Sequence, residues 1–145
     1  MATKTFTTMV GLENYIESAC EIAVKNVAER MVEELQSYIR EDFYNQYKPR
    51  FYTRTYQLLK SPKYNMLSSN SAEIFIDMDV IHYLIGDPQY DYNESDIVKL
   101  ASLGYHGTTD IYRPGMFWED FIDWCNKNVS QLLKSELKKQ GLIIK

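Results

Sequence analysis

The chain has 145 residues, a net charge of −4, and ordinary proportions of apolar (45%) and charged (25%) residues, which suits one domain with a buried core. The acidic balance argues against a dedicated nucleic-acid-binding protein, and no stretch approaches the roughly 20 apolar residues of a membrane-spanning helix. The Thr-rich first residues show no secretory signal. We therefore expect a single domain over residues 1–145, without membrane association, that is made in a cytoplasm or packaged into a particle assembled there.

The first predicted element is a long helix over residues 11–48, after a flexible segment over residues 1–10. No Gly or Pro interrupts it after Gly11, and Pro49 ends it. Its polar face is acidic, with eight acids against three bases between residues 11 and 42. At about 1.5 Å per residue, we expect part of so long a helix to project or kink. Apolar residues in steps of three and four define its buried face: Leu12, Tyr15, Ile16, Ala19, Ala23, Val27, Met31, Leu35, Tyr38 and Ile39.

The next segment, residues 43–72, differs in charge and composition, with five bases, no acid and five of the 12 tyrosines. A short helix is predicted over Thr53–Leu59, capped by Thr53 or Thr55 and ended by the Ser61-Pro62 pair. Three of its residues are expected to face inward: Tyr56, Leu58 and Leu59. The polar run Ser68–Ser71 is predicted to be a loop.

A small antiparallel sheet is predicted over residues 72–106. Period-two alternation over Ala72–Asp79 predicts a half-buried strand, and Val80–Ile85 is either its continuation or a second strand. The turn signal Gly86-Asp87-Pro88 opens a mobile acidic loop over residues 86–96. Ile97–Tyr105 is a weaker strand candidate that the pattern does not separate from a helix.

The last predicted element is a helix over residues 114–140. Acids near its start and lysines near its end complement the helix dipole, and Gly141 suits a helix stop. Its buried face is predicted to contain Phe117, Phe121, Cys125, Val129, Leu132 and Leu133, joined by Trp118 and Trp124. The predicted fold class is α+β: a long N-terminal helix, a short helix, a small antiparallel sheet and a C-terminal helix packed on the sheet.

The residues that carry chemistry do not form a recognisable catalytic or metal-binding pattern. His82 and His106 lie alone and are interpreted as structural, and Cys20 and Cys125 as reduced core residues. No Gly-rich phosphate loop and no nucleophile motif is present in the sequence. We therefore expect no cofactor, no metal and no enzymatic activity.

Charge reverses along the chain after residue 72, since residues 73–96 hold seven acids and no Lys or Arg. Asp77 and Asp79 are predicted to share one strand face, where solvated carboxylates are favoured over a cation site or an acid–base pair. The opposite charges of the two segments are either two solvated surfaces, or a basic patch of one subunit that meets the acidic patch of the next around a ring. The candidate channel-facing or partner-facing acids are Asp77, Asp79, Asp87, Asp91, Glu94 and Asp96.

The stretch Tyr44–Ser61 fits the pattern Y-x-x-Y-x-P-x-x-Y-x-R-T-x-x-L-x-x-S directly after the long helix. This pattern resembles the HK97-like tail-component family, the small tail-completion or neck proteins of long-tailed phages. A looser similarity covers His106-Gly107 and Arg113–Phe117. The resemblance implies a ring-forming subunit without catalytic residues. It assigns an interface or a fold-defining corner to Tyr44, Tyr47, Pro49, Tyr52, Arg54, Thr55 and Leu58.

The functional hypothesis is a structural virion protein that forms a ring, hexameric or larger, at the head–tail junction or tail terminus. Its partners would be copies of itself, neighbouring neck or tail-tube proteins, and DNA that passes through a channel. The virion would be assembled in the cytoplasm of a bacterial host. The alternative is a small regulatory module that binds nucleic acid or protein through residues 44–61, because Arg, Lys and aromatic side chains together suit phosphates and bases.

Overall fold

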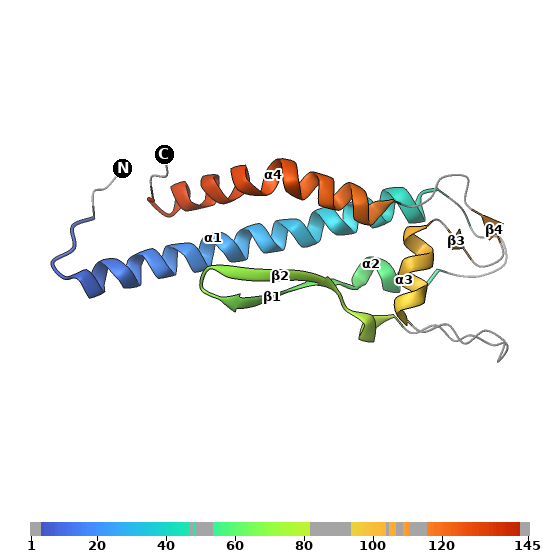
Figure 1. The fold of residues 1–145 in the computed structure, drawn as a ribbon, viewed down its shortest axis with the longest axis horizontal. Helices are drawn as coiled ribbons and strands as arrows, with labels where there is room; N and C mark the ends of the chain where they lie inside the picture. The colour runs from blue at the N-terminus through green and yellow to red at the C-terminus, as the bar shows by residue number, and fades with distance from the viewer. Residues whose placement is uncertain are drawn as a thin grey trace. The chain divides into compact units, whose positions relative to one another are not determined.

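A computed structural model of the chain describes residues 4–46, 48, 54–81, 94–103, 105–106, 109–110 and 116–142 (Figure 1). The chain forms two compact units, which are described one at a time. Unit 1 comprises Met1–Met31, Tyr64–Ile74 and Trp124–Lys145, and unit 2 comprises Val32–Lys63 and Phe75–Asp123. The fold class is α+β, as the sequence predicts.

Helices dominate the described residues, together with two small two-stranded sheets, β1–β2 and β3–β4. The elements in chain order are α1 (Met9–Tyr38), the π-helix η1 (Ile39–Tyr44), α2 (Gln57–Lys60), β1 (Pro62–Ser68), β2 (Ser71–Ile76), the 3-10 helix η2 (Met78–Val80), α3 (Glu94–Ser102), β3 (Tyr105–His106), β4 (Thr109–Asp110) and α4 (Phe117–Lys139).

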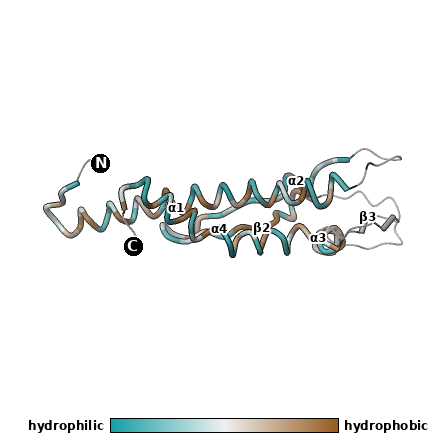
Figure 2. Tube along the Cα trace, turned by 90° about the horizontal axis from the view of Figure 1, so that it is seen from above, coloured by the Kyte–Doolittle hydropathy of each residue, from teal (hydrophilic) through white to brown (hydrophobic). Residues whose placement is uncertain are grey.

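The long N-terminal helix is confirmed with different bounds, because α1 begins at Met9 and changes into η1 after Tyr38. Its start is held by Thr8, whose side-chain oxygen accepts a hydrogen bond from the Gly11 backbone N–H at 3.1 Å. Figure 2 shows apolar residues recurring along α1 between polar ones, which is the pattern that predicted the helix.

In unit 1, α1 and α4 lie side by side (Figure 1), and most of the residues that α1 buries there are small. Ala19, Ala23, Val27 and Ala28 of α1 are buried, and so is Leu137 of α4. The pair is also joined by polar bonds. The Tyr15 hydroxyl donates to the Gln140 carbonyl, and the Asn26 side chain donates to Glu136 Oε2 at 3.0 Å.

The C-terminal end of α4 is a Schellman motif built on Gly141. The Gly141 N–H donates to the Lys138 carbonyl and the Leu142 N–H to the Leu137 carbonyl, both at 3.0 Å. Gly141 has a φ of 87°, and a Cβ at this position would lie 2.8 Å from the Tyr15 hydroxyl oxygen. Glycine is therefore required here for its backbone conformation and for space, and the predicted helix stop is confirmed.

The β1–β2 hairpin lies along α1 in unit 1 (Figure 1). The Tyr64 hydroxyl donates to Glu29 Oε1 at 3.0 Å, and the Ser69 hydroxyl donates to Glu17 Oε1 at 3.1 Å. Strand β1 was not predicted, although Pro62, Tyr64 and Met66 alternate with exposed residues. The predicted loop Ser68–Ser71 is shorter than expected, because only Ser69 and Asn70 form the turn.

The core of unit 2 gathers apolar side chains from five helical elements and from Ile81. Its buried residues are Leu35, Ile39, Phe43, Tyr44, Leu58, Ile81, Ala101, Phe117 and Phe121. Ser61 is also fully buried, and its hydroxyl donates to the Leu58 carbonyl at 2.8 Å. The Ser61 carbonyl in turn accepts from the Asp77 N–H at 2.8 Å, which ties the end of α2 to the end of β2.

Two predictions for residues 86–105 are wrong in part. Glu94–Ser102 forms helix α3, so residues 94–96 are not loop and Ile97–Ser102 is not strand. The helix is favoured because no Gly or Pro interrupts it, Ile97 and Ala101 are four residues apart, and Lys99 lies in its last turn. The strand predicted over Val80–Ile85 is also wrong for Val80, which is the last residue of η2. Residues 82–85 lie outside the described residues.

Candidate functional site

The corner after the long helix is held together by Arg54 in unit 2. The Arg54 Nη1 atom donates to the Tyr44 carbonyl at 2.5 Å, and the guanidinium carbon lies 5.3 Å from the centre of the Tyr44 ring. The centres of the Tyr44 and Tyr56 rings are 4.9 Å apart, and Leu58 of α2 is buried. We call Tyr44, Arg54, Tyr56 and Leu58 the Tyr44 corner. Arg54 thus reaches a carbonyl in the segment that ends the long N-terminal helix.

The π-helix η1 explains why Tyr44 is available to this corner. The Asn45 N–H donates to the Arg40 carbonyl at 2.8 Å, a bond that spans five residues instead of four. The wider turn buries Phe43 and Tyr44 together, although they are neighbours in sequence, with their rings 5.1 Å apart and nearly perpendicular. No sequence signal predicted this segment, and π-helices are rare enough that none would be expected.

Tyr56 departs from the prediction in its backbone and in its exposure. Its φ of 56° is left-handed, and among the described residues it is the sole non-glycine with a positive φ. It precedes α2 as its N-cap without a side-chain capping bond, so capping by Thr55 is wrong, and Thr53 lies outside the described residues. The side chain is 43% exposed instead of facing inward. The chain therefore accepts a strained residue at this corner.

Asp77 and Asp79 do not share a strand face, because the chain leaves the extended conformation at Asp77 and enters η2. Asp77 Oδ1 caps η2 by accepting from the Asp79 N–H at 3.1 Å, while Oδ2 accepts from the Lys63 ammonium. The hydrogen bond from Lys63 lowers the pKa of the Asp77 carboxyl below its ordinary value. A base of segment 43–72 thus meets an acid of segment 73–96 within one chain.

Several predicted site residues are not among those that the structure describes. Outside them lie Tyr47, Pro49, Tyr52, Asp87, Asp91 and His82. For Glu94, Asp96 and His106 only the backbone is described. Thr55 is exposed, while Cys20 and Cys125 are free thiols, both half-buried instead of core residues. Burial raises the pKa of the Cys125 thiol, which makes it less reactive than an exposed cysteine.

An exposed apolar group at the start of α4 was missed in the sequence. Trp118 was predicted to join the buried face but is 36% exposed, and Met116 and Ile122 are also exposed. Trp118 and Ile122 are four residues apart and therefore lie on one face of α4, with the Trp118 ring 5.8 Å from Phe121. Trp118 directly follows Phe117, which places it about 100° around the helix from that buried residue, but it is also three residues before Phe121, so the spacing alone did not exclude it from the buried face.

Tyr38, also in unit 2, lies close to several carboxylates. Its pKa is raised first by burial, and then by Glu34, Asp120, Asp42 and Glu41. In the described part of the chain, no group of three or more His, Cys, Asp or Glu side chains is placed to hold a metal ion. None of the described helices is long and apolar enough to cross a membrane.

Comparison with known proteins gives one family. The model of a protein family described as YomN matches residues 8–139. No curated protein and no solved structure matches the chain significantly. The matched range begins just before α1 and ends with the last residue of α4, so it covers every helix and strand that the structure describes.

Proposed function

Because the chain belongs to the YomN family, which is phage-associated, we propose that it is a structural protein of a tailed-phage virion and not an enzyme. Copies of the chain would form a ring, a hexamer or larger, at the head–tail junction or the tail terminus. The ring would contact neighbouring neck or tail-tube proteins, and DNA would pass through its channel. The family match over residues 8–139 is the observation that carries this proposal.

The Tyr44 corner gives the proposal physical support. A ring subunit acts through its shape, so it needs a segment that holds its conformation while neighbours bind. Arg54 meets this need because it engages the backbone and the ring of Tyr44 at the same time. Two of the residues that carry the resemblance to tail-completion proteins, Tyr44 and Arg54, are therefore in direct contact, and a third, Leu58, is buried in the core of the same unit.

The test is the location of the protein and the effect of its loss. Virions made from the genome that encodes the chain are purified, and the chain is sought by mass spectrometry and by immunogold labelling. We expect label at the neck or tail end, and deletion of the gene should leave unjoined heads and tails in electron micrographs. Normal infectious particles without the gene, and virions that lack the chain, would refute the proposal.

The alternative function, a regulatory module that binds nucleic acid or protein through residues 44–61, predicts a different result. Such a module would be absent from virions and would shift a DNA fragment with a steep dependence on salt. Arg54 and Lys63, two of the five bases of segment 43–72, are already bonded within the chain, which leaves fewer charges for phosphates. We therefore favour the structural role.

A further inference from the structure

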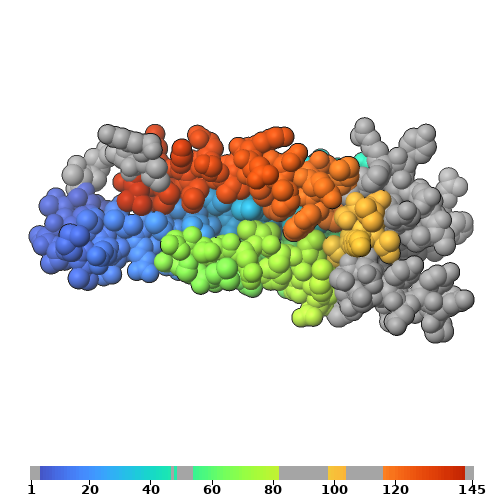
Figure 3. Space-filling model, viewed as in Figure 1, coloured from blue at the N-terminus to red at the C-terminus, as the bar shows by residue number. Residues whose placement is uncertain are grey.

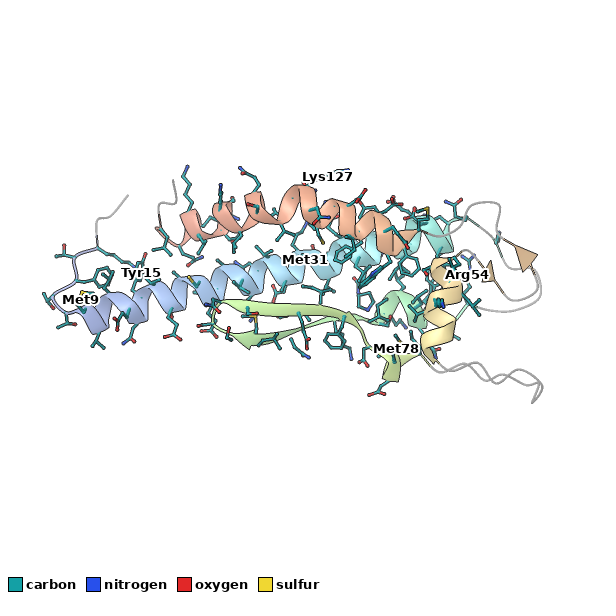
Figure 4. All side chains as sticks on the ribbon, in the orientation of Figure 1. Met9, Tyr15, Met31, Arg54, Met78 and Lys127 are labelled. Carbon is teal, nitrogen blue, oxygen red and sulfur yellow. The ribbon has the colours of Figure 1, made fainter. Side chains whose placement is uncertain are left out.

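The second half of α4 presents lysines on the side turned away from α1 in unit 1. Lys127, Lys134 and Lys138 are exposed and lie seven and four residues apart, so they form one ridge, the lysine stripe. Lys134 and Lys138 each lie two residues from Glu136, which bonds to α1, and two residues correspond to about 200° around a helix. Figure 4 shows Lys127 on the outer side of α4, and Figure 3 shows this helix at the surface.

No acid lies on this exposed side of α4 between residues 124 and 142. Glu136 is the only acid of that range, and it is bonded to Lys139 at 2.5 Å and to Asn26. Both contacts lower the pKa of the Glu136 carboxyl, that with Lys139 first. The charge of Glu136 is thus offset inside the chain. Lys127, Lys134 and Lys138 form no ion pair within the described residues, and exposed Asp123 lies four residues before Lys127 on the same ridge.

The first half of α1 carries a stripe of the opposite sign in the same unit. Glu13, Glu17 and Glu21 are exposed and four residues apart, which places them on one ridge, the glutamate stripe. Glu13 and Glu17 each lie two residues from Tyr15, which bonds to α4, so this stripe also faces away from the helix pair. Within the described residues no cation forms an ion pair with these three glutamates, and Glu17 accepts only the neutral Ser69 hydroxyl.

The two stripes are similar in length, and an exposed apolar residue flanks the glutamate stripe. Glu13 to Glu21 spans about 12 Å along α1, and Lys127 to Lys138 spans about 16 Å along α4, at 1.5 Å per residue. Ile16 flanks the glutamate stripe and is 41% exposed, so it offers apolar area to the alkyl chains of lysines. Because both stripes face outward from the helix pair that carries them, they cannot pair with each other inside one copy.

We propose that the lysine stripe of one copy of this chain binds the glutamate stripe of the next. Two different surfaces that complement each other make a heterologous contact, and such contacts close into a ring when the rotation between copies allows it. This inference rests on the proposed ring and names the surface that builds it. It uses a different surface from the contact between segments 43–72 and 73–96 that the sequence left open, where one base and one acid, Lys63 and Asp77, already pair within one chain.

Exposed ion pairs are individually weak and are screened by salt, so the contact has a characteristic salt dependence. Sedimentation of the full chain is measured at up to several hundred micromolar, in low and in high sodium chloride. We expect concentration-dependent association at low salt that is about tenfold weaker at high salt. A wild-type chain that stays monomeric at low salt and high concentration overturns the stripe proposal.

Two variants test the pairing directly, and both spare the residues with structural bonds. Glu13→Lys/Glu21→Lys makes both stripes positive, and Lys127→Glu/Lys134→Glu makes both stripes negative. Each variant alone should remain monomeric, and an equimolar mixture should associate again, because every contact in it joins opposite charges. The control Lys60→Glu/Lys99→Glu has the same charge change as the second variant at exposed positions elsewhere, and it should associate like wild type.

The outcomes separate this inference from the proposed function. Variants that associate as well as wild type, or a mixture that does not associate, would overturn the stripe contact. A virion that contains the chain in a ring held by another surface would leave the proposed function standing. Circular dichroism of each variant should match wild type, and the mixture supplies its own folding control, since misfolded variants would not restore association.

Discussion

Removing the Arg54 side chain should destabilise the protein by a measurable and specific amount. Arg54→Ala deletes a charged hydrogen bond to the Tyr44 carbonyl, which contributes about 1.5–3 kcal/mol, and a contact with the Tyr44 ring that contributes about 0.5–1 kcal/mol. The free energy of unfolding should fall by about 2–4 kcal/mol. At an m value of about 2 kcal/mol/M, the urea midpoint falls by about 1–2 M.

The assay is equilibrium urea unfolding, followed by the fluorescence of Trp118 and Trp124 and by circular dichroism. Arg54→Lys keeps the charge but loses the planar group, so it should fall between wild type and Arg54→Ala. Lys48→Ala, an exposed base of the same segment, is the control and should change stability by less than about 0.5 kcal/mol. If Arg54→Ala behaves like this control, the Tyr44 corner does not hold the fold.

Three further predictions concern the helix end, the core and pH. Gly141→Ala should lower the free energy of unfolding by about 1–2.5 kcal/mol, through its φ and the Tyr15 hydroxyl, and by less in a Tyr15→Phe background, as a double-mutant cycle in urea would show. Leu58→Ala should cost about 2–5 kcal/mol in the same assay, because Leu58 is buried in the core of unit 2; a smaller loss would mean that the site collapses easily. The pKa of Asp77 is lower in the folded chain than in the unfolded one, so its contribution to stability is present above the unfolded value near 3.8 and is lost as pH falls through the folded value. In thermal melts, the stability of Asp77→Asn should therefore fall less between pH 5 and pH 2 than the stability of wild type does. An equal fall in both proteins would exclude the Lys63–Asp77 pair as a cause.

The two long helices could be predicted from the sequence because each carries a continuous apolar pattern and clear end signals. The corner contact between Arg54 and Tyr44 could be anticipated because a basic side chain shortly after a helix can reach the last carbonyls. The left-handed Tyr56 could not, since only tertiary contacts hold a residue of this type there.

The Lys63–Asp77 pair shows why some site contacts were beyond the sequence. The two residues are 14 positions apart, and they meet only because β1 and β2 fold back on each other at Ser69 and Asn70. With Pro62–Ser68 not recognised as a strand, nothing indicated that Lys63 would return to Asp77. The opposite charges of the two segments were therefore interpreted either as two solvated surfaces or as a contact between subunits. Helix α3 was missed for a related reason, since a run of nine residues fits either period when its partners are unknown.

The π-helix η1 also has a consequence for evolution. Its hydrogen bonds span five residues, so the segment Ile39–Tyr44 holds one residue more than an α-helical ladder of the same length requires. A homologue that lacks one residue here can form ordinary α-helical hydrogen bonds through this segment. Its helix would still end with a carbonyl that can accept a hydrogen bond from Arg54. Single-residue gaps in an alignment of this family should therefore concentrate between positions 39 and 44, whereas gaps within α1 would rotate every later apolar residue off the buried face.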